Sequence, residues 1–242
     1  MSTANLPTPA RALAIGAHPD DIEFGCGGTL AKWVSAGCEI FHLVCTDGSK
    51  GSWDPDVDTA ALVLRRHAEQ RAASQRLGAT GSVVFLDWPD GELEAGLRQR
   101  MQVAAWIRRI QPDVVLAHDP WKRYRLHPDH RSAGFLSIDA IVAARDPHFF
   151  PEIALAPHRP TELLLFEADE PDHYEDVSRT FDTKIAALLA HESQLESTMR
   201  FTNREKSEGR DAFIARERDR LAPPEYLGDD GLFEAFKRIS PL

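Results

Sequence analysis

Side chains that suit metal-assisted acid–base chemistry are concentrated near the N-terminus of this 242-residue chain, in the tetrapeptide His18-Pro19-Asp20-Asp21. An imidazole nitrogen and a carboxylate oxygen are both good ligands for a divalent cation such as zinc. A further carboxylate beside the ion can accept a proton from a water molecule that the metal acidifies. The tetrapeptide therefore indicates a hydrolytic metal site, with His18 and Asp21 as ligands and Asp20 as the general base.

A purely structural interpretation of the same residues is also open. Asp20 or Asp21 would then cap the helix that follows, and His18 would be a hydrogen-bonded loop residue. Short motifs of this kind also occur by chance, so the elements around the tetrapeptide decide between the two interpretations.

The residues on either side of the tetrapeptide predict a strand followed by a helix. Residues 12–17 form a short apolar run that is typical of a buried strand in a parallel sheet. Gly25, Gly27 and Gly28 lead into residues 29–33, which are typical of the start of a helix. The tetrapeptide thus occupies a loop at the carboxyl end of a parallel strand, where α/β proteins bind their ligands.

Strand and helix patterns alternate through the rest of the chain. Strands are expected at residues 39–46, 82–86, 113–117 and 161–167, and helices at 59–77, 97–110, 131–144, 182–192, 207–220 and 232–239. The alternation predicts an α/β fold with the doubly wound strand order 3-2-1-4-5. We expect residues 1–10 to be a disordered lead and residues 11–242 to form one domain, with a helical elaboration from about residue 195.

A second polar loop follows the fourth expected strand. It contains three histidines and, just before the next expected helix, one carboxylate: His118, His127, His130 and Asp129. The first and fourth strands are neighbours in the expected order, so both loops should open onto one crevice. His130 is the best third metal ligand, and Asp129 and His127 are free to orient a ligand or transfer a proton. His118 is expected to be a solvated loop histidine.

Composition argues against several classes of protein. The chain is 43% hydrophobic and 27% charged, as in globular proteins, and has no run of about 18 apolar residues that would span a membrane. Its net charge of -10 argues against nucleic acid and anionic membranes as partners. Cys26, Cys38 and Cys45 form no CxxC pair, which favours reduced thiols and a cytoplasmic location. A homo-oligomer is compatible with the sequence.

Together, these motifs resemble those of the LmbE-like or PIG-L family of metal-dependent N-deacetylases. The matching residues are His18 to Asp21, Gly27 and Gly28, Thr46 to Gly48, Arg66 with Glu69, Leu77 and Gly78, His127 to His130, Lys184, and His191 to Gln194. The resemblance implies a Rossmann-like, three-layer α/β/α fold with a mostly parallel sheet. It also implies hydrolysis of an acetamide on an N-acetylglucosamine-type sugar. Lys50 departs from the family, which often has Glu at this position.

The resemblance also implies roles for individual residues. Three residues would bind Zn2+, with Fe2+ or another divalent metal as the alternative: His18, Asp21 and His130. In the same comparison, Asp20 would act as the general base and His127 would stabilise the oxyanion. Asp129 would orient His127, and Arg66 would support the aspartates.

Two other functions fit some of these residues. Two histidines and a carboxylate also form the facial triad of non-haem iron oxygenases. A Rossmann-like pattern also suits a nucleotide-binding module. Asp20 beside the ligands favours hydrolysis over oxygen chemistry, and residues 25–28 lack the GxGxxG spacing of dinucleotide sites.

Aromatic and basic residues are expected around the mouth of the crevice. The aromatic ones, Trp53, Trp88, Trp121 and Tyr124, would suit the apolar face of a sugar. Lys122, Arg123 and Arg125 would add a positive patch, which favours a negatively charged group on the substrate. Core packing for two of the tryptophans and a solvated basic loop are the simpler alternative.

Overall fold

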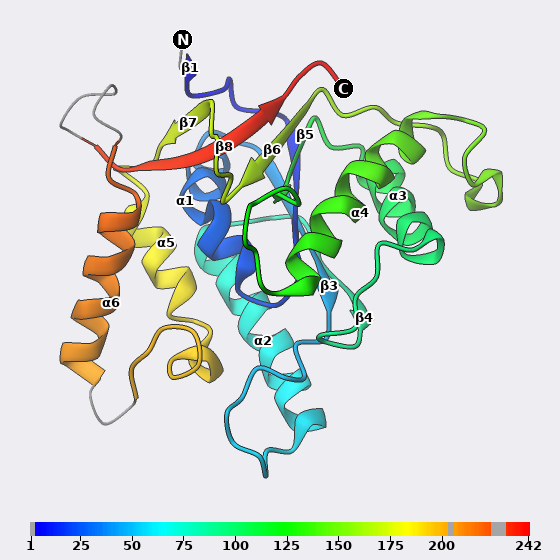
Figure 1. Ribbon diagram of the computed structural model, residues 1–242. Helices are drawn as coiled ribbons and strands as arrows, with labels where there is room; N and C mark the ends of the chain where they lie inside the picture. The colour runs from blue at the N-terminus through cyan, green and yellow to red at the C-terminus, as the bar shows by residue number, and fades with distance from the viewer. Residues whose placement is uncertain (1–2, 203–205, 224–230) are drawn as a thin grey trace.

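The computed structural model describes residues 3–202, 206–223 and 231–242, and its described strands form one eight-stranded sheet between two layers of helices (Figure 1). The strands are β1 (Thr3–Ala4), β2 (Arg11–Gly16), β3 (Glu39–Thr46), β4 (Val83–Trp88), β5 (Val114–His118), β6 (Glu162–Phe166), β7 (His173–Asp176) and β8 (Phe233–Ile239). Their order across the sheet is β1-β7-β8-β6-β5-β2-β3-β4. The expected α/β fold with a mostly parallel sheet is confirmed.

Five strands carry the part of the sheet that positions the candidate site. β4, β3, β2, β5 and β6 are neighbours in that order, and each adjacent pair is parallel. This is the expected order 3-2-1-4-5, counted over the five strands that the sequence predicts. The carboxyl ends of β2 and β5 therefore lie side by side, with Ile15 in register with Ala117.

Helices cover both faces of the sheet. They are α1 (Asp21–Ser35), α2 (Thr59–Leu77), α3 (Leu97–Ile110), α4 (Pro128–Arg145), α5 (Phe181–Leu188) and α6 (Lys206–Arg220), with short 3-10 turns η1 (Pro151–Ile153) and η2 (Glu192–Gln194). α3 and α4 pack on one face, whereas α1, α2 and α5 pack on the other (Figure 1). None of these described helices is long and apolar enough to cross a bilayer.

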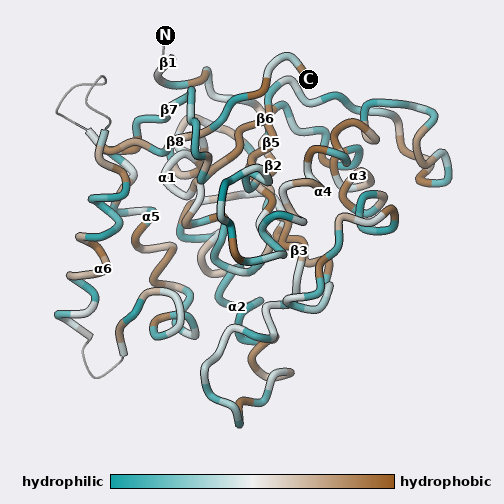
Figure 2. The backbone as a smooth tube through the Cα atoms, viewed as in Figure 1, coloured by the Kyte–Doolittle hydropathy of each residue, from teal (hydrophilic) through white to brown (hydrophobic). Residues whose placement is uncertain are grey.

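Two hydrophobic cores lie on opposite faces of the sheet. Leu13 and Ile15 of β2 point into the core under α3 and α4, whereas Ala12 and Ala14 point into the core under α1 and α2. Because both faces are covered, the strand is apolar at every position rather than at alternate ones. Figure 2 shows this concentration of hydrophobic residues along the central strands, while α6 is mainly hydrophilic.

Helix α1 begins earlier than the sequence indicates. Its first residue is Asp21, and the glycines expected before the helix lie within it, around a kink at Cys26. A Cβ atom at Gly25 would stand 2.5 Å from the ring of Phe166, and one at Gly28 would stand 2.8 Å from Val177. These glycines therefore allow α1 to approach the sheet and its C-terminal neighbours, since any side chain there would collide.

The C-terminal region differs from the expected helix at residues 232–239. Residues Phe233–Ile239 form β8, which pairs antiparallel with both β6 and β7. Glu234 and Phe236 alternate into the interior with 2% and 0% exposure. A buried glutamate makes the two-residue period of the strand look polar, which explains why the sequence suggests a short closing helix.

The N-terminal segment also differs from the expected disordered lead. Residues 3–4 form β1, which pairs parallel with β7. The amide of Asn5 donates to the carbonyl of Tyr174 at 3.0 Å, and that of Leu6 to Glu175 Oε1 at 2.7 Å. Leu6 also packs against the core under α1 and α2. These contacts hold the segment at the edge of the sheet.

Glu234 connects the last strand to the helix that follows the candidate site. Its Oε1 accepts from the amide of Gly28 at 2.9 Å and from Lys184 Nζ at 2.6 Å, and its Oε2 accepts from the amide of Thr29 at 2.7 Å. Both members of the Lys184–Glu234 ion pair are buried. Loss of one partner would leave an uncompensated buried charge.

We predict that Glu234→Ala lowers the free energy of unfolding by about 3–5 kcal/mol, the usual cost of breaking a buried ion pair. Urea denaturation followed by circular dichroism measures this loss. Lys237→Ala is the matched control, because Lys237 lies on the same strand but pairs with Asp172 at the surface. A loss for Glu234→Ala no larger than for Lys237→Ala would contradict the structural role of this carboxylate.

Candidate active site

The loops that follow β2 and β5 form one wall of a cavity of about 280 Å³ at the carboxyl end of the sheet. The lining residues come from these two loops and the first turns of α1 and α4 that follow them, from the loops after β3 and β4, and from α2 and the segment at and after η2: His18, Asp20, Asp21, Lys50, Gly51, Arg66, Asp90, Gly91, His127, His130, Gln194 and Thr198. The fold therefore brings together the two histidine-containing loops, as the strand order requires.

Asp20 has an unusual backbone conformation at the start of α1. Its φ of 106° lies in the left-handed region, which is costly for a residue other than glycine. Its amide donates to Gln70 Oε1 on α2 at 3.0 Å, and its side chain makes no capping hydrogen bond to α1. The geometry thus argues against a capping role for Asp20, whose carboxylate is left facing the cavity.

The three expected metal ligands converge on one point. His130 Nε2 lies 3.2 Å from His18 Nδ1 and 3.3 Å from Asp21 Oδ1, and His18 Nδ1 lies 3.3 Å from Asp21 Oδ2. A tetrahedral zinc ion with bonds of about 2.0–2.2 Å holds its ligand atoms roughly 3.3–3.6 Å apart. The spacing of the three side chains therefore fits a divalent ion.

Three other sets of potential ligands overlap with this one: His18, His127 and His130; Asp21, His118 and His130; and His18, Asp90 and Asp129. Asp129 already accepts two backbone hydrogen bonds, from Gly91 at 2.6 Å and from Leu93 at 3.2 Å. Its Oδ2 lies 3.2 Å from His18 Nε2, the nitrogen that faces away from the other two ligands. A carboxylate in this position orients a metal-binding imidazole rather than binding the metal itself.

The pKa values of the clustered groups depend on burial and on the charges beside each group. Burial raises the pKa of Asp21, but His130 and His118 beside it outweigh burial and hold the pKa well below its usual range. Burial lowers the pKa of His130 to about 3, so its ring is neutral, the form that binds metals. Burial also lowers the pKa of His18, but contacts with Asp129, Asp21 and Asp90 raise it well above the usual value.

Asp20 carries an additional carboxyl group in the same cavity. Burial raises its pKa to about 6, although the Arg66 guanidinium opposes this shift. The site therefore gathers several buried acidic groups around one histidine. A buried excess of negative charge requires a positive partner, which a divalent cation would supply.

Arg66 lies where the resemblance places it, behind the aspartates. Its Nη1 donates to the carbonyl of Gly48 at 2.8 Å and its Nη2 to the carbonyl of Pro19 at 2.7 Å. The same Nη2 lies 3.7 Å from Asp20 Oδ2. The buried guanidinium thus links the loop after β2 to the loop after β3 and faces the Asp20 carboxylate.

A buried polar network is connected to Asp20 through Gln70. Gln70, which accepts the Asp20 amide, donates from Nε2 to Glu23 Oε1 at 2.7 Å. The other oxygen of Glu23 lies 3.3 Å from His191 Nε2, and His42 Nε2 lies 3.7 Å from Glu23 Oε1. All four of these side chains have 0% exposure. The network fixes the position of α2 relative to the tetrapeptide.

His127 lies at the mouth of the cavity, whereas the partner of Asp129 differs from the expected one. The ring of His127 meets that of His18 edge-on, with centroids 4.5 Å apart, and stacks on His130 at 5.0 Å. Asp129 contacts His18 and the backbone of Gly91 and Leu93, as described above. The hydrogen bond of Asp129 is therefore to the ring of His18 and not, as expected, to that of His127.

His118 differs from the expected solvated histidine. It is the last residue of β5 and is only 2% exposed. Its Nε2 lies 3.2 Å from Asp21 Oδ2, and its ring stacks on that of His130 with centroids 4.4 Å apart. Its position at the end of a buried strand, one residue later than the predicted strand end, is the sequence feature that could have indicated this.

Sequence reasoning also missed Asp90. Its Oδ1 lies 3.2 Å from His18 Nε2, and its Oδ2 accepts from the amide of Lys50 at 3.1 Å. The side chain of Lys50 contacts the carbonyl of Asp90 and lies 3.2 Å from Glu92 Oε1. Lys50 therefore connects the loops after β3 and β4. A turn pattern, Pro-Asp-Gly, was the only sequence signal at Asp90.

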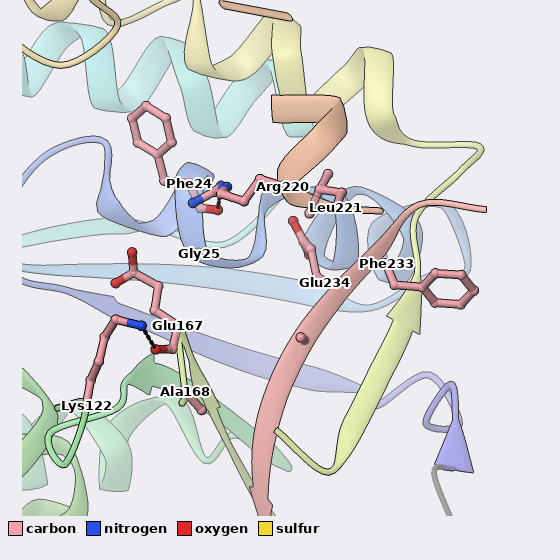
Figure 3. A pocket seen from close by; sticks show the side chains of 10 residues that line it. Phe24, Gly25, Lys122, Glu167, Ala168, Arg220, Leu221, Phe233 and Glu234 are labelled. Carbon is pink, nitrogen blue, oxygen red and sulfur yellow. Dashed lines mark hydrogen bonds between the residues drawn. The ribbon is translucent and has the colours of Figure 1, made fainter. Parts of the chain in front are cut away.

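Two of the three side chains of the expected positive patch, those of Lys122 and Arg125, are paired with carboxylates. Lys122 Nζ donates to the carbonyl of Glu167 at 2.8 Å and lies 3.3 Å from Asp169 Oδ1, and Arg125 pairs with the Glu167 carboxylate. Figure 3 shows Lys122 and Glu167 together at one side of a separate cavity of about 230 Å³, opposite Arg220. That cavity shares no lining residue with the one that holds the metal-binding cluster.

The aromatic residues divide into two groups. Trp88 is half-buried, packs against the core under α3 and α4, and donates from Nε1 to Gln102 Oε1 at 2.8 Å. Trp53, Trp121 and Tyr124 are 77%, 59% and 87% exposed. The packing alternative thus holds for Trp88, and the other three rings remain accessible at the surface.

Comparison with known proteins identifies relatives of the chain. The diacetylchitobiose deacetylase of Thermococcus kodakarensis is 36% identical over 187 residues, which cover 76% of this chain and 70% of that protein. The 4-oxalmesaconate hydratase of Pseudomonas putida is 30% identical over 203 residues, covering 77% and 75% respectively. The solved N,N'-diacetylchitobiose deacetylase from Pyrococcus horikoshii, complexed with its inhibitor MPG, aligns with a TM-score of 0.84 and 27% identity. That alignment covers 96% of this chain and 84% of the other.

A family assignment follows from the same comparisons. The family described as PIG-L, GlcNAc-PI de-N-acetylase, matches residues 13–141, more than half of the chain. The matched segment contains both histidine-containing loops. The expected resemblance and the expected class of enzyme, a hydrolase of amide bonds, are confirmed by this match and by the named deacetylases. This chain therefore belongs to the PIG-L family.

Proposed function

We propose that this chain removes the acetyl group from an N-acetylglucosamine-type compound, with a divalent metal held by His18, Asp21 and His130. The observation that carries the proposal is the convergence of these three side chains to within 3.3 Å of one another, in the cavity that also holds Asp20. The deacetylase names of two relatives support the choice of an acetylated amino sugar.

Zinc is our choice of metal. Two imidazoles and one carboxylate leave a coordination position open for water or substrate, as in catalytic zinc sites. Iron(II) or cobalt would also accept these ligands. When bound, the ion would polarise the acetamide carbonyl and make a water molecule more acidic.

Asp20 is the residue that we assign to proton transfer. Its carboxylate accepts a proton as a water oxygen attacks the acetamide carbon, and the proton then passes to the nitrogen as the C–N bond breaks. The products are acetate and a free amine. The Asp20 amide is fixed by Gln70, and its carboxylate faces the Arg66 guanidinium, so the group is held in one orientation.

His127 and Asp129 have separate tasks in this proposal. His127 lies at the mouth with its ring against those of His18 and His130, and an N–H of its imidazole would donate to the carbonyl oxygen as negative charge develops there. Asp129 keeps Nε2 of His18 engaged, which directs Nδ1 toward the metal.

The two alternative functions receive less support. A non-haem iron oxygenase would not need a general base beside its ligands, and the relatives reported above carry deacetylase and hydratase names. A nucleotide-binding module would need an accessible glycine loop after β2. In this chain the glycines lie inside α1 and are packed against Phe166 and Val177.

We predict that the purified protein releases acetate from N-acetylglucosamine compounds, because its metal ligands and general base surround one cavity. Treatment with a chelator should abolish the release, and added Zn2+ should restore it. An enzymatic acetate assay measures both. The 30% identical hydratase supplies the competing outcome: absence of acetate release by the metal-loaded protein, together with addition of water to a carbon–carbon double bond, would contradict the proposal.

We predict that Asp20→Asn retains the metal but lowers kcat by on the order of 10²–10⁴, the usual contribution of a general base. Metal content is measured by elemental analysis and kcat by acetate release. Asp182→Asn is the matched control, since Asp182 lies on α5 and does not line the cavity. Normal turnover by metal-loaded Asp20→Asn would place the base elsewhere.

A further inference from the structure

A second cavity, of about 250 Å³, lies beside the metal-binding one. It is lined by residues of the loop after β3 and of the segment that contains η2: Gly51, Ser52, Trp53, Asp54, Ser193, Glu196 and Ser197. We call it the Trp53 cavity. Its two walls lie at the lower end of the molecule in Figure 1, where the loop between β3 and α2 approaches the coil that follows α5.

The Trp53 cavity adjoins the cavity that is lined by His18, Asp21 and His130. Gly51 lines both, and Gln194 and Thr198 of the metal-binding cavity are the chain neighbours of Ser193 and Ser197 in the other. A substrate whose acetamide reaches His130 would therefore extend its remaining part along this wall.

The two walls are held together by hydrogen bonds. Gln194 Nε2 donates to the carbonyl of Gly51 at 3.0 Å. Each wall is also tied to α2: Ser193 Oγ in the η2 segment donates to Glu69 Oε2 at 2.5 Å, and Arg66 Nη1 donates to the carbonyl of Gly48, in the loop after β3, at 2.8 Å. A cavity with fixed walls loses less entropy on binding than one that must be ordered by its ligand.

The side chains of the Trp53 cavity suit a sugar ring. Trp53 is 77% exposed, so its indole face is available for the apolar face of a pyranose. Asp54 and Glu196 are exposed carboxylates that can accept hydrogen bonds from hydroxyl or ammonium groups. No lysine or arginine is among the residues that line this cavity. An anionic group would therefore meet two like charges, whereas a neutral or cationic sugar would not.

We infer that the Trp53 cavity is a subsite for the group attached to the N-acetylglucosamine unit, and that it selects a neutral or positively charged glycosyl group. The inference rests on the proposed deacetylase function, which it deepens by naming the substrate class. It differs from the anionic substituent that the sequence favours, because two of the basic residues behind that expectation, Lys122 and Arg125, are paired with Asp169 and Glu167. The third, Arg123, lines a different cavity.

A second exposed tryptophan provides a matched control. Trp121 lines a cavity of about 280 Å³ with Asp119, Arg123, Asp169, Glu170 and Lys237. That cavity shares no lining residue with the metal-binding one. Trp121 is therefore an exposed indole beside a hollow of similar size that is not continuous with the site.

The test compares initial rates of acetate release from three compounds: N-acetylglucosamine, the neutral disaccharide N,N'-diacetylchitobiose and the anionic N-acetylglucosamine 1-phosphate. We expect the disaccharide to have the highest kcat/KM. Trp53→Ala should lower kcat/KM for the disaccharide about 10-fold, the effect of losing one aromatic anchor, and leave the monosaccharide within about 2-fold. Trp121→Ala should leave both unchanged.

Charge selection is tested by the double variant Asp54→Asn with Glu196→Gln. Removal of the two negative charges should raise kcat/KM for the 1-phosphate by about 3- to 10-fold and leave the monosaccharide unaffected. An unchanged preference between the disaccharide and the 1-phosphate in this variant would overturn the assigned charge selection. Equal effects of Trp53→Ala on monosaccharide and disaccharide would overturn the subsite itself.

A binding measurement separates the subsite from the catalytic proposal. Tryptophan fluorescence of the chelator-treated protein is titrated with N,N'-diacetylchitobiose, so that no turnover is needed. A saturable change in the wild type that is lost in Trp53→Ala and kept in Trp121→Ala supports the subsite even if no compound releases acetate. The same titration curve for the wild type and Trp53→Ala would refute it even if the deacetylase function holds.

Discussion

Three buried carboxylates contact the single ring of His18, and the site is built around their negative charge. Asp21 approaches Nδ1 at 3.3 Å, while Asp90 and Asp129 approach Nε2 at 3.2 Å each. Such a concentration of like charge in a buried place is unfavourable unless positive charge balances it. The ring of His18 alone supplies at most one charge, whereas the divalent ion that we propose among His18, Asp21 and His130 would supply two.

Hydrogen bonds that involve backbone amides hold these carboxylates in place. Asp129 accepts amide hydrogen bonds from the loop after β4, and Asp90 accepts one from the loop after β3. Asp20 is held in a left-handed conformation by Gln70, whose amide group reaches back to Glu23. Because every support comes from a different element, the site exists only when the strands adopt this order.

The sequence was sufficient to predict the parallel strand order, and it singled out the three side chains that we propose as metal ligands. His18, Asp21 and His130 occur in compact motifs at the ends of two apolar strands, so local pattern and topology indicate the same place. Asp90 and His118 were not predicted as site residues, since each is an isolated residue whose role depends on tertiary contacts. β8 was predicted as a helix for a related reason: Glu234 is a charged residue, yet its side chain is buried.

The orientation of Asp129 illustrates the same limit. Its place beside His127 in the sequence suggests that it orients that ring, yet its carboxylate turns toward His18 and two backbone amides. Adjacent residues in the first turn of a helix project in different directions, so proximity in the chain does not establish contact. Assignment of contacts such as this one therefore needs the folded structure.

The most direct test of the account is the location of the metal by anomalous X-ray diffraction from crystals of the zinc-loaded protein. The account predicts one peak within about 2.0–2.2 Å of His18 Nδ1, an oxygen of Asp21 and His130 Nε2. An anomalous peak at bonding distance from Asp90 and Asp129 instead, or no peak anywhere in the cluster, would contradict the account.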